Sequence, residues 1–203
     1  MKLLMAALLI VSAVPFVNAQ VQVGDILCEG DHVVSPSDYD SSGYTAIGVV
    51  FYVDETSQHG WAVSLDNVGC CSWGKYNEDT SLDNVCGNGR ASRDTDGYAN
   101  TKTILEENED YSAFTTVDFE GGWYLPAIGQ MKRLYANFDE VNETLKKIGG
   151  TIFERNGYTY WSSTEHTAYD AWYMCSIGGI GCTSDSFNDC KTSPRWIRSV
   201  KDF

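Results

Sequence analysis

The spacing of apolar residues along the chain predicts strands near both of its ends. Runs of apolar and aromatic residues that are bounded by turn-forming residues are typical of strands. Such runs occupy residues 46–53, 60–65, 158–163, 171–177 and 195–201. The polar stretch between the first two has the length of a hairpin loop, so these two strands are expected to pair.

Between these strands the apolar spacing changes to that of helices. Apolar residues at intervals of three and four predict one helix from about residue 128 to 138. A second helix is expected to follow, capped by Asp139 and ended by the glycines at 149–150. A shorter helix is expected from about 101 to 108, with residue 100 or 101 as its N-cap. Terminal strands with two to three helices between them predict an α+β fold.

The first 19 residues have the order of a cleaved signal peptide. Lys2 precedes an apolar stretch that ends in Val17-Asn18-Ala19, the small-residue pattern that signal peptidase accepts. An uncleaved anchor is less favoured, because the stretch is short for a membrane span and no stop-transfer charges follow it. No second long apolar segment occurs, so no membrane span is expected. The mature chain is expected to begin at Gln20 and to be secreted, periplasmic or on the cell surface.

The remaining chain is long enough for one domain with a sizeable core. Residues 20–45 are polar and are expected to form an extended lead-in with few strong elements, and residues 46–203 a single domain. Residues 66–100 carry three cysteines and no periodicity, which predicts a long loop region pinned by disulfides. The aromatic share of 13% argues against disorder.

The net charge of −14 is concentrated in the first half of the chain. Residues 20–122 hold 19 acidic side chains against four Lys and Arg, whereas residues 123–203 hold nine of each. An acidic half repels nucleic acids and anionic membranes, so neither is an expected partner. It would attract cations or basic surfaces, although solubility outside the cell explains the charge more simply.

Seven cysteines follow residue 19, and an oxidising compartment makes all of them disulfide candidates. Three bridges are expected, at least one within 70–86 and one within 175–190, with one cysteine left free or intermolecular. The adjacent pair at 70–71 is not expected to bond to itself. A zinc site is the less favoured alternative, because no C-x2-C pair occurs. The candidates are Cys28, Cys70, Cys71, Cys86, Cys175, Cys182 and Cys190.

Neither a metal nor another cofactor is expected. The segment from Asp94 to Gly97 begins like an EF-hand loop, but positions five and twelve of that loop are Tyr98 and Leu105. Neither side chain supplies the oxygen ligand that the pattern needs. A turn that leads into a helix is therefore the better interpretation of this segment.

Five short motifs follow one another in the second half of the chain. They are residues 123–126 (WYLP), 160–165 (YWSSTE), 171–172 (AW), 178–179 (GG) and 195–198 (RWIR). The ordered set covers about residues 121–200 and resembles the Lcl C-terminal domain family, a bacterial domain of largely unknown function named from a collagen-like surface adhesin. The resemblance implies a C-type-lectin-like fold, in which the N- and C-terminal strands pair and a long irregular loop region forms one face.

Two departures from the family pattern limit what the resemblance implies. Ala127 stands where the family usually has Thr or Ser, so the hydroxyl N-cap of the following helix is missing. The calcium-lectin sugar motifs are absent as well. Calcium-dependent sugar binding is therefore not carried over to this chain.

Trp161, Glu165 and Trp172 are the candidate ligand-binding residues. The two tryptophans could stack on a sugar ring or on a partner's side chain, but tryptophans on strands more often pack in the core. Glu165 could bind a cation together with nearby acidic residues, although their spacing is not that of a ligand set. Arg195 and Arg198 lie three apart on a strand and face opposite sides. One of them is expected to form a buried or semi-buried ion pair, with Glu165 as its suggested partner.

The chain is not expected to be an enzyme, because the nucleophile elbow, the H-E-x-x-H motif and the P-loop are all missing. An enzyme related to the formylglycine generators, with Cys175 and Cys182 as the reactive residues, is the least favoured alternative. The favoured hypothesis is a secreted or surface binding module that recognises a protein or glycan in adhesion. The alternative is a structural or accessory subunit of a surface assembly. In that case a free cysteine or a terminal strand would join neighbours into an oligomer.

Overall fold

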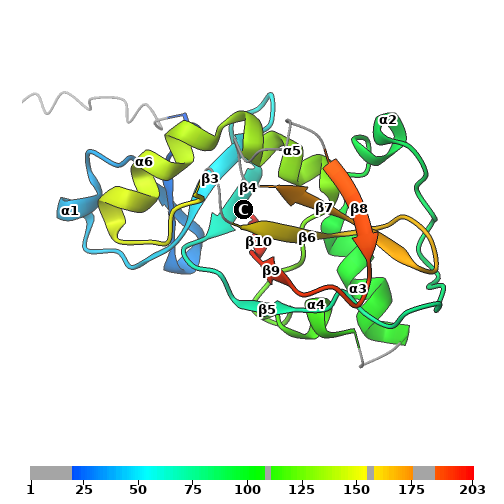
Figure 1. The fold of residues 1–203 in the computed structure, drawn as a ribbon. Coiled ribbons are helices and arrows are strands. Elements are labelled where there is room, and N and C mark those ends of the chain that lie inside the picture. Colours follow the sequence, from blue (N-terminus) through cyan, green and yellow to red (C-terminus); the bar gives the residue numbers. More distant parts are fainter. Residues whose placement is uncertain (1–19, 108–110, 155–157, 176–185) are drawn as a thin grey trace, which may run out of the picture.

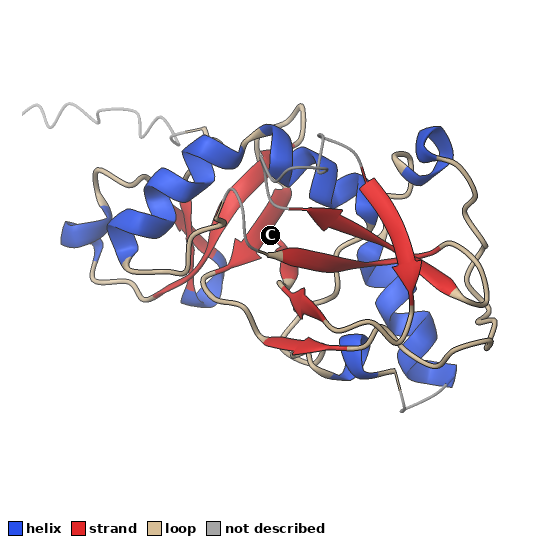
Figure 2. Ribbon diagram, viewed as in Figure 1, coloured by secondary structure: helices blue, strands red, loops and turns tan. Residues whose placement is uncertain are grey.

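The computed structural model describes residues 20–107, 111–154, 158–175 and 186–203. In these residues the chain forms a mixed α+β fold with two five-stranded sheets and six α-helices. Figures 1 and 2 show the two sheets side by side, with helices packed around them. The prediction of an α+β fold is confirmed at this level.

The first sheet has the strand order β10-β4-β3-β1-β2, and each neighbouring pair is antiparallel. The second sheet has the order β5-β9-β6-β7-β8, in which only the β6–β9 contact is parallel. The strands of the first sheet are β1 (Ile26–Cys28), β2 (His32–Val34), β3 (Ala46–Val53), β4 (Gly60–Ser64) and β10 (Val200–Asp202). Those of the second are β5 (Gly69–Cys71), β6 (Thr159–Glu165), β7 (Asp170–Cys175), β8 (Ser186–Cys190) and β9 (Arg195–Ile197).

Three of the six helices are longer than one turn. Helix α6 packs on β3, α5 packs on β3 and on β6 and β7 of the second sheet, and α3 packs on β6 (Figure 1). Their bounds are α3 (Gly97–Glu107), α5 (Ile128–Ala136) and α6 (Phe138–Ile148). The four-residue helices are α1 (Tyr39–Ser42), α2 (Asn88–Ala91) and α4 (Ser112–Thr115), and a 3-10 turn covers Glu29–Asp31.

The buried side chains form two clusters. The larger lies between the first sheet, β6, β7, α5 and α6, and includes Phe51, Tyr160 and Trp172. The smaller lies under α3 and α4 and is built around Trp73 and Trp161. Large aromatic rings therefore supply much of the apolar area that stabilises each half.

The segment at 20–45, predicted as an extended lead-in with few strong elements, contains the short strands β1 and β2 and the four-residue helix α1. Strand β1 lies between β2 and β3, and its three residues are fully buried. Thr144 of α6 donates a hydrogen bond to the Gly24 carbonyl at 2.7 Å, which fixes the start of this segment. A three-residue apolar run in a polar context carries too little pattern to be recognised without its neighbours.

The closing strand predicted at 195–201 is two strands in different sheets. Strand β9 pairs with β5 and β6, and β10 pairs with β4. The chain crosses between the sheets at Arg198, whose buried guanidinium donates to the carbonyls of Ser64, Leu65 and Thr151 at 2.7–2.9 Å. These bonds fasten the crossing to two other segments of the chain.

The pairing of the predicted terminal strands is confirmed in one respect: β10, from the predicted closing strand, pairs with β4, the second arm of the N-terminal hairpin. Strands β1 and β10 belong to the same sheet, but β3 and β4 lie between them. The long β3–β4 hairpin, which the sequence predicts, occupies the centre of the sheet because its pattern of buried residues is the most continuous. Each terminal strand therefore pairs with one arm of this hairpin.

Two predicted helix caps need correction. Helix α3 begins at Gly97, and its first turn is capped by Asp96, whose Oδ1 accepts from the Ala99 amide at 2.9 Å. A Cβ on Gly97 would lie within 2.6 Å of the Leu125 carbonyl oxygen, so only glycine fits there. Helix α6 begins at Phe138, which places Asp139 inside its first turn rather than at the N-cap.

Candidate functional site

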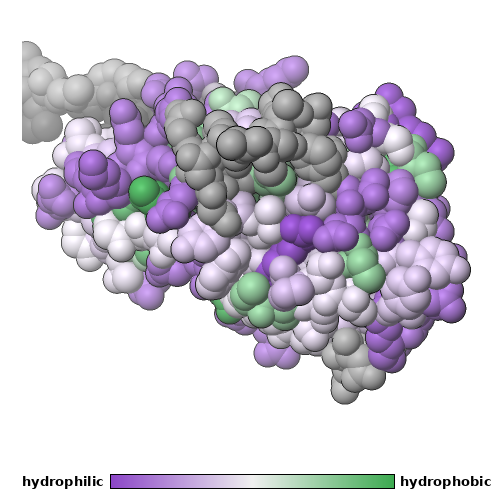
Figure 3. Space-filling view, viewed as in Figure 1, coloured by the Kyte–Doolittle hydropathy of each residue, from purple (hydrophilic) through white to green (hydrophobic). Residues whose placement is uncertain are grey.

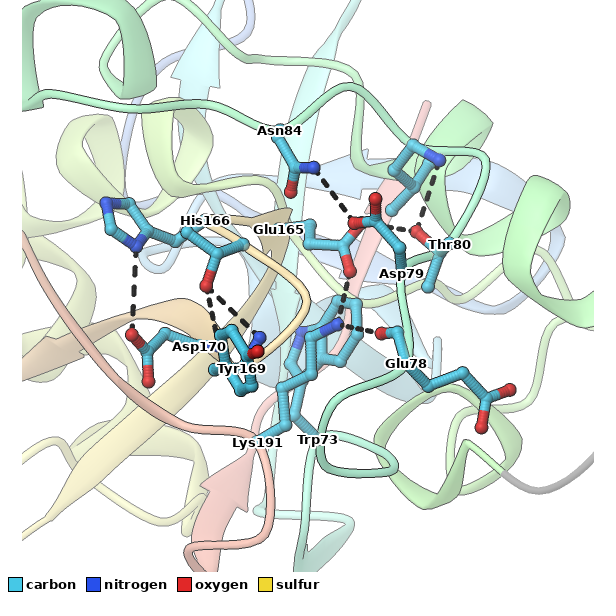
Figure 4. Close-up of polar contacts among 12 residues, drawn as sticks. Trp73, Glu78, Asp79, Thr80, Asn84, Glu165, His166, Tyr169, Asp170 and Lys191 are labelled. Carbon is cyan, nitrogen blue, oxygen red and sulfur yellow. Dashed lines mark hydrogen bonds and ion pairs between the residues drawn. The ribbon is translucent and has the colours of Figure 1, made fainter.

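A buried ion pair lies where a long loop covers one end of the second sheet (Figure 4). We call residues 72–87, which connect β5 to α2 without a helix or strand, the covering loop. Strand β6 ends at Glu165 beneath this loop, and β8 ends at the same side of the sheet because β6, β7 and β8 are antiparallel. The fold therefore brings Glu165 and Lys191 to one place.

Glu165 and Lys191 form an ion pair in which both side chains are fully buried. The Lys191 ammonium also donates to the Glu78 carbonyl at 2.7 Å, and it lies 4.8 Å from the centre of the Trp73 ring. Thr80 donates to the second carboxylate oxygen of Glu165 at 2.5 Å. The pair is thus enclosed by the covering loop, with a partner for each charged group.

The electrostatics of the pair are dominated by the loss of water. Burial raises the pKa of the Glu165 carboxyl, and the hydrogen bonds from Lys191 and Thr80 only partly oppose this rise. Moving a carboxylate and an ammonium out of water costs several kcal/mol for each ion, an effect of about the size of their mutual attraction. A buried carboxyl with a raised pKa and a specific charged partner is a feature of functional sites as well as of structural ion pairs.

The covering loop is held down by this pair and by the strands beneath it. The main-chain amides of Trp73 and Val85 donate to the carbonyls of Lys191 and Glu165, at 2.8 and 3.1 Å. The indole of Trp172 donates to the Val85 carbonyl at 2.8 Å. The sequence predicted a loop pinned by disulfides, whereas the structure pins it with an ion pair and main-chain hydrogen bonds.

The hydroxyl groups of β6 hold the neighbouring elements. Thr164 accepts from the Ile128 amide at 3.0 Å and donates to Asp94 at 2.7 Å. Gln130, the third residue of α5, accepts from the Ala127 amide at 3.0 Å. The N-terminus of α5 is therefore capped by Gln130 and by Thr164 of β6. These contacts replace the hydroxyl cap that Ala127 lacks. The hydroxyl-rich run in the YWSSTE motif therefore satisfies main-chain groups at a junction of elements.

A cleft with a volume of about 250 Å³ opens beside the pair, and Glu165 forms part of its wall. Three acidic side chains line it, but the described residues contain no group of three or more His, Cys, Asp or Glu that could hold a metal ion. Asp94 is already engaged by Asn100 and Thr164. The cleft is lined by Leu82, Asp83, Val85, Asp94, Asn100 and Glu165.

All three candidate ligand-binding residues are buried. Trp161, Glu165 and Trp172 are 0%, 1% and 2% exposed. The Trp161 indole donates to the carbonyls of Cys71 and Ser193, at 3.2 and 3.3 Å, so its polar edge is satisfied inside the protein. In this conformation both tryptophans act as core residues, and only Glu165 reaches a cleft.

The suggested partner of Glu165 was wrong. Its partner is Lys191, while Arg195 pairs with Asp189 and stacks at 3.4 Å over the Tyr173 ring. Lys191 lies in a polar segment after a strand, a context that is typical of an exposed lysine. No local pattern identifies it, because its burial depends on the covering loop from a distant part of the chain.

An exposed aromatic pair lies at the rim of the same region. Tyr76 of the covering loop and Tyr169 of the β6–β7 turn are 60% and 47% exposed, with ring centres 5.3 Å apart. On the face shown in Figure 3 the described surface is mostly hydrophilic or neutral, with small separate apolar patches. This pair could not be predicted from the sequence, since two tyrosines 93 positions apart carry no common signal.

The cysteines do not form the predicted framework in the described residues. Cys70, Cys71 and Cys86 are free, as are Cys28 and Cys190. The bridge predicted within 70–86 is therefore wrong. Cys71 lies on β5 beside Thr116, whereas Cys86 lies in the covering loop near the His166 carbonyl. Cys175 is disulfide-bonded, and Cys182 and the motif at 178–179 lie outside the described residues. The bridge within 175–190 stays a prediction.

Comparison with known proteins gives a likeness of fold. No protein-family model matches the chain, and no curated protein matches it. The chain is similar to the crystal structure of a fimbrial protein from Bacteroides ovatus, with a TM-score of 0.71 and 18% sequence identity. The match covers 90% of this chain and 49% of the fimbrial protein, so the chain spans about half the length of that protein. Among the described residues, no helix is long and apolar enough to cross a membrane.

Proposed function

We propose that this chain is an exported structural or accessory subunit of a cell-surface assembly. The observation that carries the proposal is the similarity of its fold, over nine tenths of its length, to a fimbrial protein. The order of charge, apolar stretch and small residues at positions 2–19 supports export. A surface or extracellular location follows from the same two observations.

Open sheet edges support the assembly role. Strands β2 and β10 are the outer strands of the first sheet, and β5 and β8 those of the second. The outer edge of β10 is already occupied, because Val200 and Tyr124 exchange two main-chain hydrogen bonds, so the open edges are those of β2, β5 and β8. An outer strand presents main-chain N–H and C=O groups that a strand from another chain can pair with. Head-to-tail contacts of this kind generate filaments when the rotation between neighbours does not close.

The finer fold assignment belongs to the same proposal. We infer a C-type-lectin-like domain related to the Lcl C-terminal domain family, on the strength of the motif order in residues 121–200. The covering loop supports the inference, because it forms an irregular face over one sheet, as that fold implies. We assign the chain no catalytic role.

The assembly proposal is tested on the native cell surface. Cells that carry the full chain with a small C-terminal epitope should release it by mechanical shearing, in particles much larger than the monomer. Electron microscopy with a labelled antibody should place the epitope on filaments or other ordered particles. Recovery of the chain only as a soluble monomer, with none on the surface, would contradict the proposal.

A secreted binding module is the second candidate function, and the tyrosine pair at positions 76 and 169 favours it. Two exposed aromatic rings supply a rigid amphipathic surface for a protein or glycan. Protein and glycan arrays probed with the mature chain should then give a ligand whose binding is lost in Tyr76→Ala. The matched control is Tyr98→Ala, which removes another exposed tyrosine (44% exposed) away from the pair. Equal binding by both variants would reject this surface.

A further inference from the structure

We propose that Glu165 and Lys191 are a self-modification site, at which the two side chains condense into an intramolecular amide (isopeptide) bond. The proposal concerns the folded chain alone and does not depend on its role in an assembly. It starts from a simple chemical fact: a carboxyl group and a primary amine are the two precursors of an amide. The fold holds one of each in contact, and both are fully buried.

The positions of the neighbouring groups suit this condensation. The Lys191 nitrogen contacts Oε1 of Glu165, the oxygen bonded to the carbon that the amine would attack. The Glu78 carbonyl accepts a hydrogen bond from a second N–H of that nitrogen at 2.7 Å and fixes its direction. The Thr80 hydroxyl donates to Oε2 at 2.5 Å, where negative charge develops in the tetrahedral intermediate. Each atom of the reaction therefore has a partner of the required polarity.

The environment removes an obstacle that prevents amide formation in water, namely the ionisation of both groups. In water both groups are ionised, and an ammonium has no lone pair with which to attack. In a dry site the ionised forms lose their hydration, which favours transfer of a proton from nitrogen to Oε1 and leaves a neutral amine beside a carboxylic acid. Burial raises the pKa of the Glu165 carboxyl, in agreement with this direction. The Trp73 ring covers the nitrogen on another side.

The reaction balances without an oxidant or a further reactant. The nitrogen–Cδ bond forms and the Cδ–Oε1 bond breaks. The Lys191 nitrogen gives two protons in all to Oε1, which leaves as one molecule of water, while Oε2 remains as the amide oxygen. The cleft of about 250 Å³ beside Glu165 offers this water a way out.

The bond would link the end of β6 directly to the residue after β8. These two points lie on either side of β7, so the link would lock the three strands and the covering loop above them. Unlike a disulfide, an amide is not broken by reducing agents. A link of this kind would explain how the covering loop, whose one cysteine at position 86 is free, remains fixed.

The test is the covalent mass of the exported full chain, measured after reduction, alkylation and denaturation. The chain should be lighter than its sequence by one water, and protease digestion should yield one branched peptide that contains both position 165 and position 191. Tandem fragmentation places the link. Cyclisation of Gln20 removes ammonia rather than water and affects a different peptide, so the two changes are distinguished.

Two variants and one control complete the experiment. Lys191→Met and Glu165→Ala should each restore the missing water and release two separate peptides, a result that mass spectrometry reads even if the variant unfolds. Lys201→Met, which removes a lysine from a surface ion pair with Asp31, should keep the link. Recovery of separate, unmodified peptides from the native folded chain would overturn the proposal and leave a plain ion pair. That outcome would not affect the assembly role.

Discussion

Replacing Trp161 with alanine separates a core role from a ligand-binding role. The ring is 0% exposed, and its indole donates to two carbonyls. A buried tryptophan removes about 150–250 Å² from water, which at about 25 cal/mol per Å² corresponds to about 4–6 kcal/mol. Comparable truncations cost about 3–5 kcal/mol, because the cavity partly collapses. We therefore expect Trp161→Ala to lower the free energy of unfolding by about 4 kcal/mol.

Urea unfolding of the mature chain, followed by circular dichroism, measures this loss. With a slope of about 2 kcal/mol per M, the midpoint should fall by about 2 M. Trp161→Phe keeps a six-membered ring in the core but loses the indole N–H that donates to two carbonyls, so it should cost about 1–2 kcal/mol. Tyr76→Ala, at an exposed position, should change stability by less than about 0.5 kcal/mol. If Trp161→Ala unfolds at the same urea concentration as wild type, the core assignment is refuted.

Three further predictions follow from the structure. A Cβ on Gly129 would lie 2.3 Å from a carbonyl oxygen, so Gly129→Ala should destabilise by about 1–3 kcal/mol in the same urea assay; Gly89→Ala, with open space around it, should not. Burial raises the pKa of Tyr160 to about 12, above about 10 in the unfolded chain. Its contribution to stability is therefore complete below about pH 10 and is lost as the pH rises towards 12, and Tyr160→Phe should reduce that fall. Iodoacetamide should label exposed Cys70 in the native chain, but it should label buried Cys28 only after unfolding. Peptide mapping measures this difference, and equal labelling of the two cysteines in the native chain would contradict the prediction.

Of the two residues in the buried ion pair, the sequence indicated only Glu165. Glu165 was a candidate because it could bind a cation together with nearby acidic residues, and it was also the suggested partner in a buried or semi-buried ion pair. Its partner was misassigned to an arginine, because Lys191 has nothing in its own neighbourhood that marks it as buried. The covering loop that buries both comes from residues 72–87, far away in the chain. Contacts of this kind depend on tertiary packing, which no periodicity records.

The sequence by itself determined the strongest elements. The apolar run at 46–53 is strand β3 with the predicted bounds, and the helix stripes at 128–138 and 139–148 are α5 and α6 within two residues at each end. In these segments the local pattern and the buried face agree, and the side-chain spacing alone specifies the element. The α+β class follows from their order.

The tertiary structure decided how these elements are joined. Whether residues 195–201 form one strand or two depends on Arg198, whose guanidinium needs carbonyl partners from two other segments. The central place of the β3–β4 hairpin separates the terminal strands. Short strands such as β1 exist only because longer neighbours supply their hydrogen bonds and cover their side chains. A three-residue segment cannot offset its own loss of conformational entropy, so its structure is set by the fold around it.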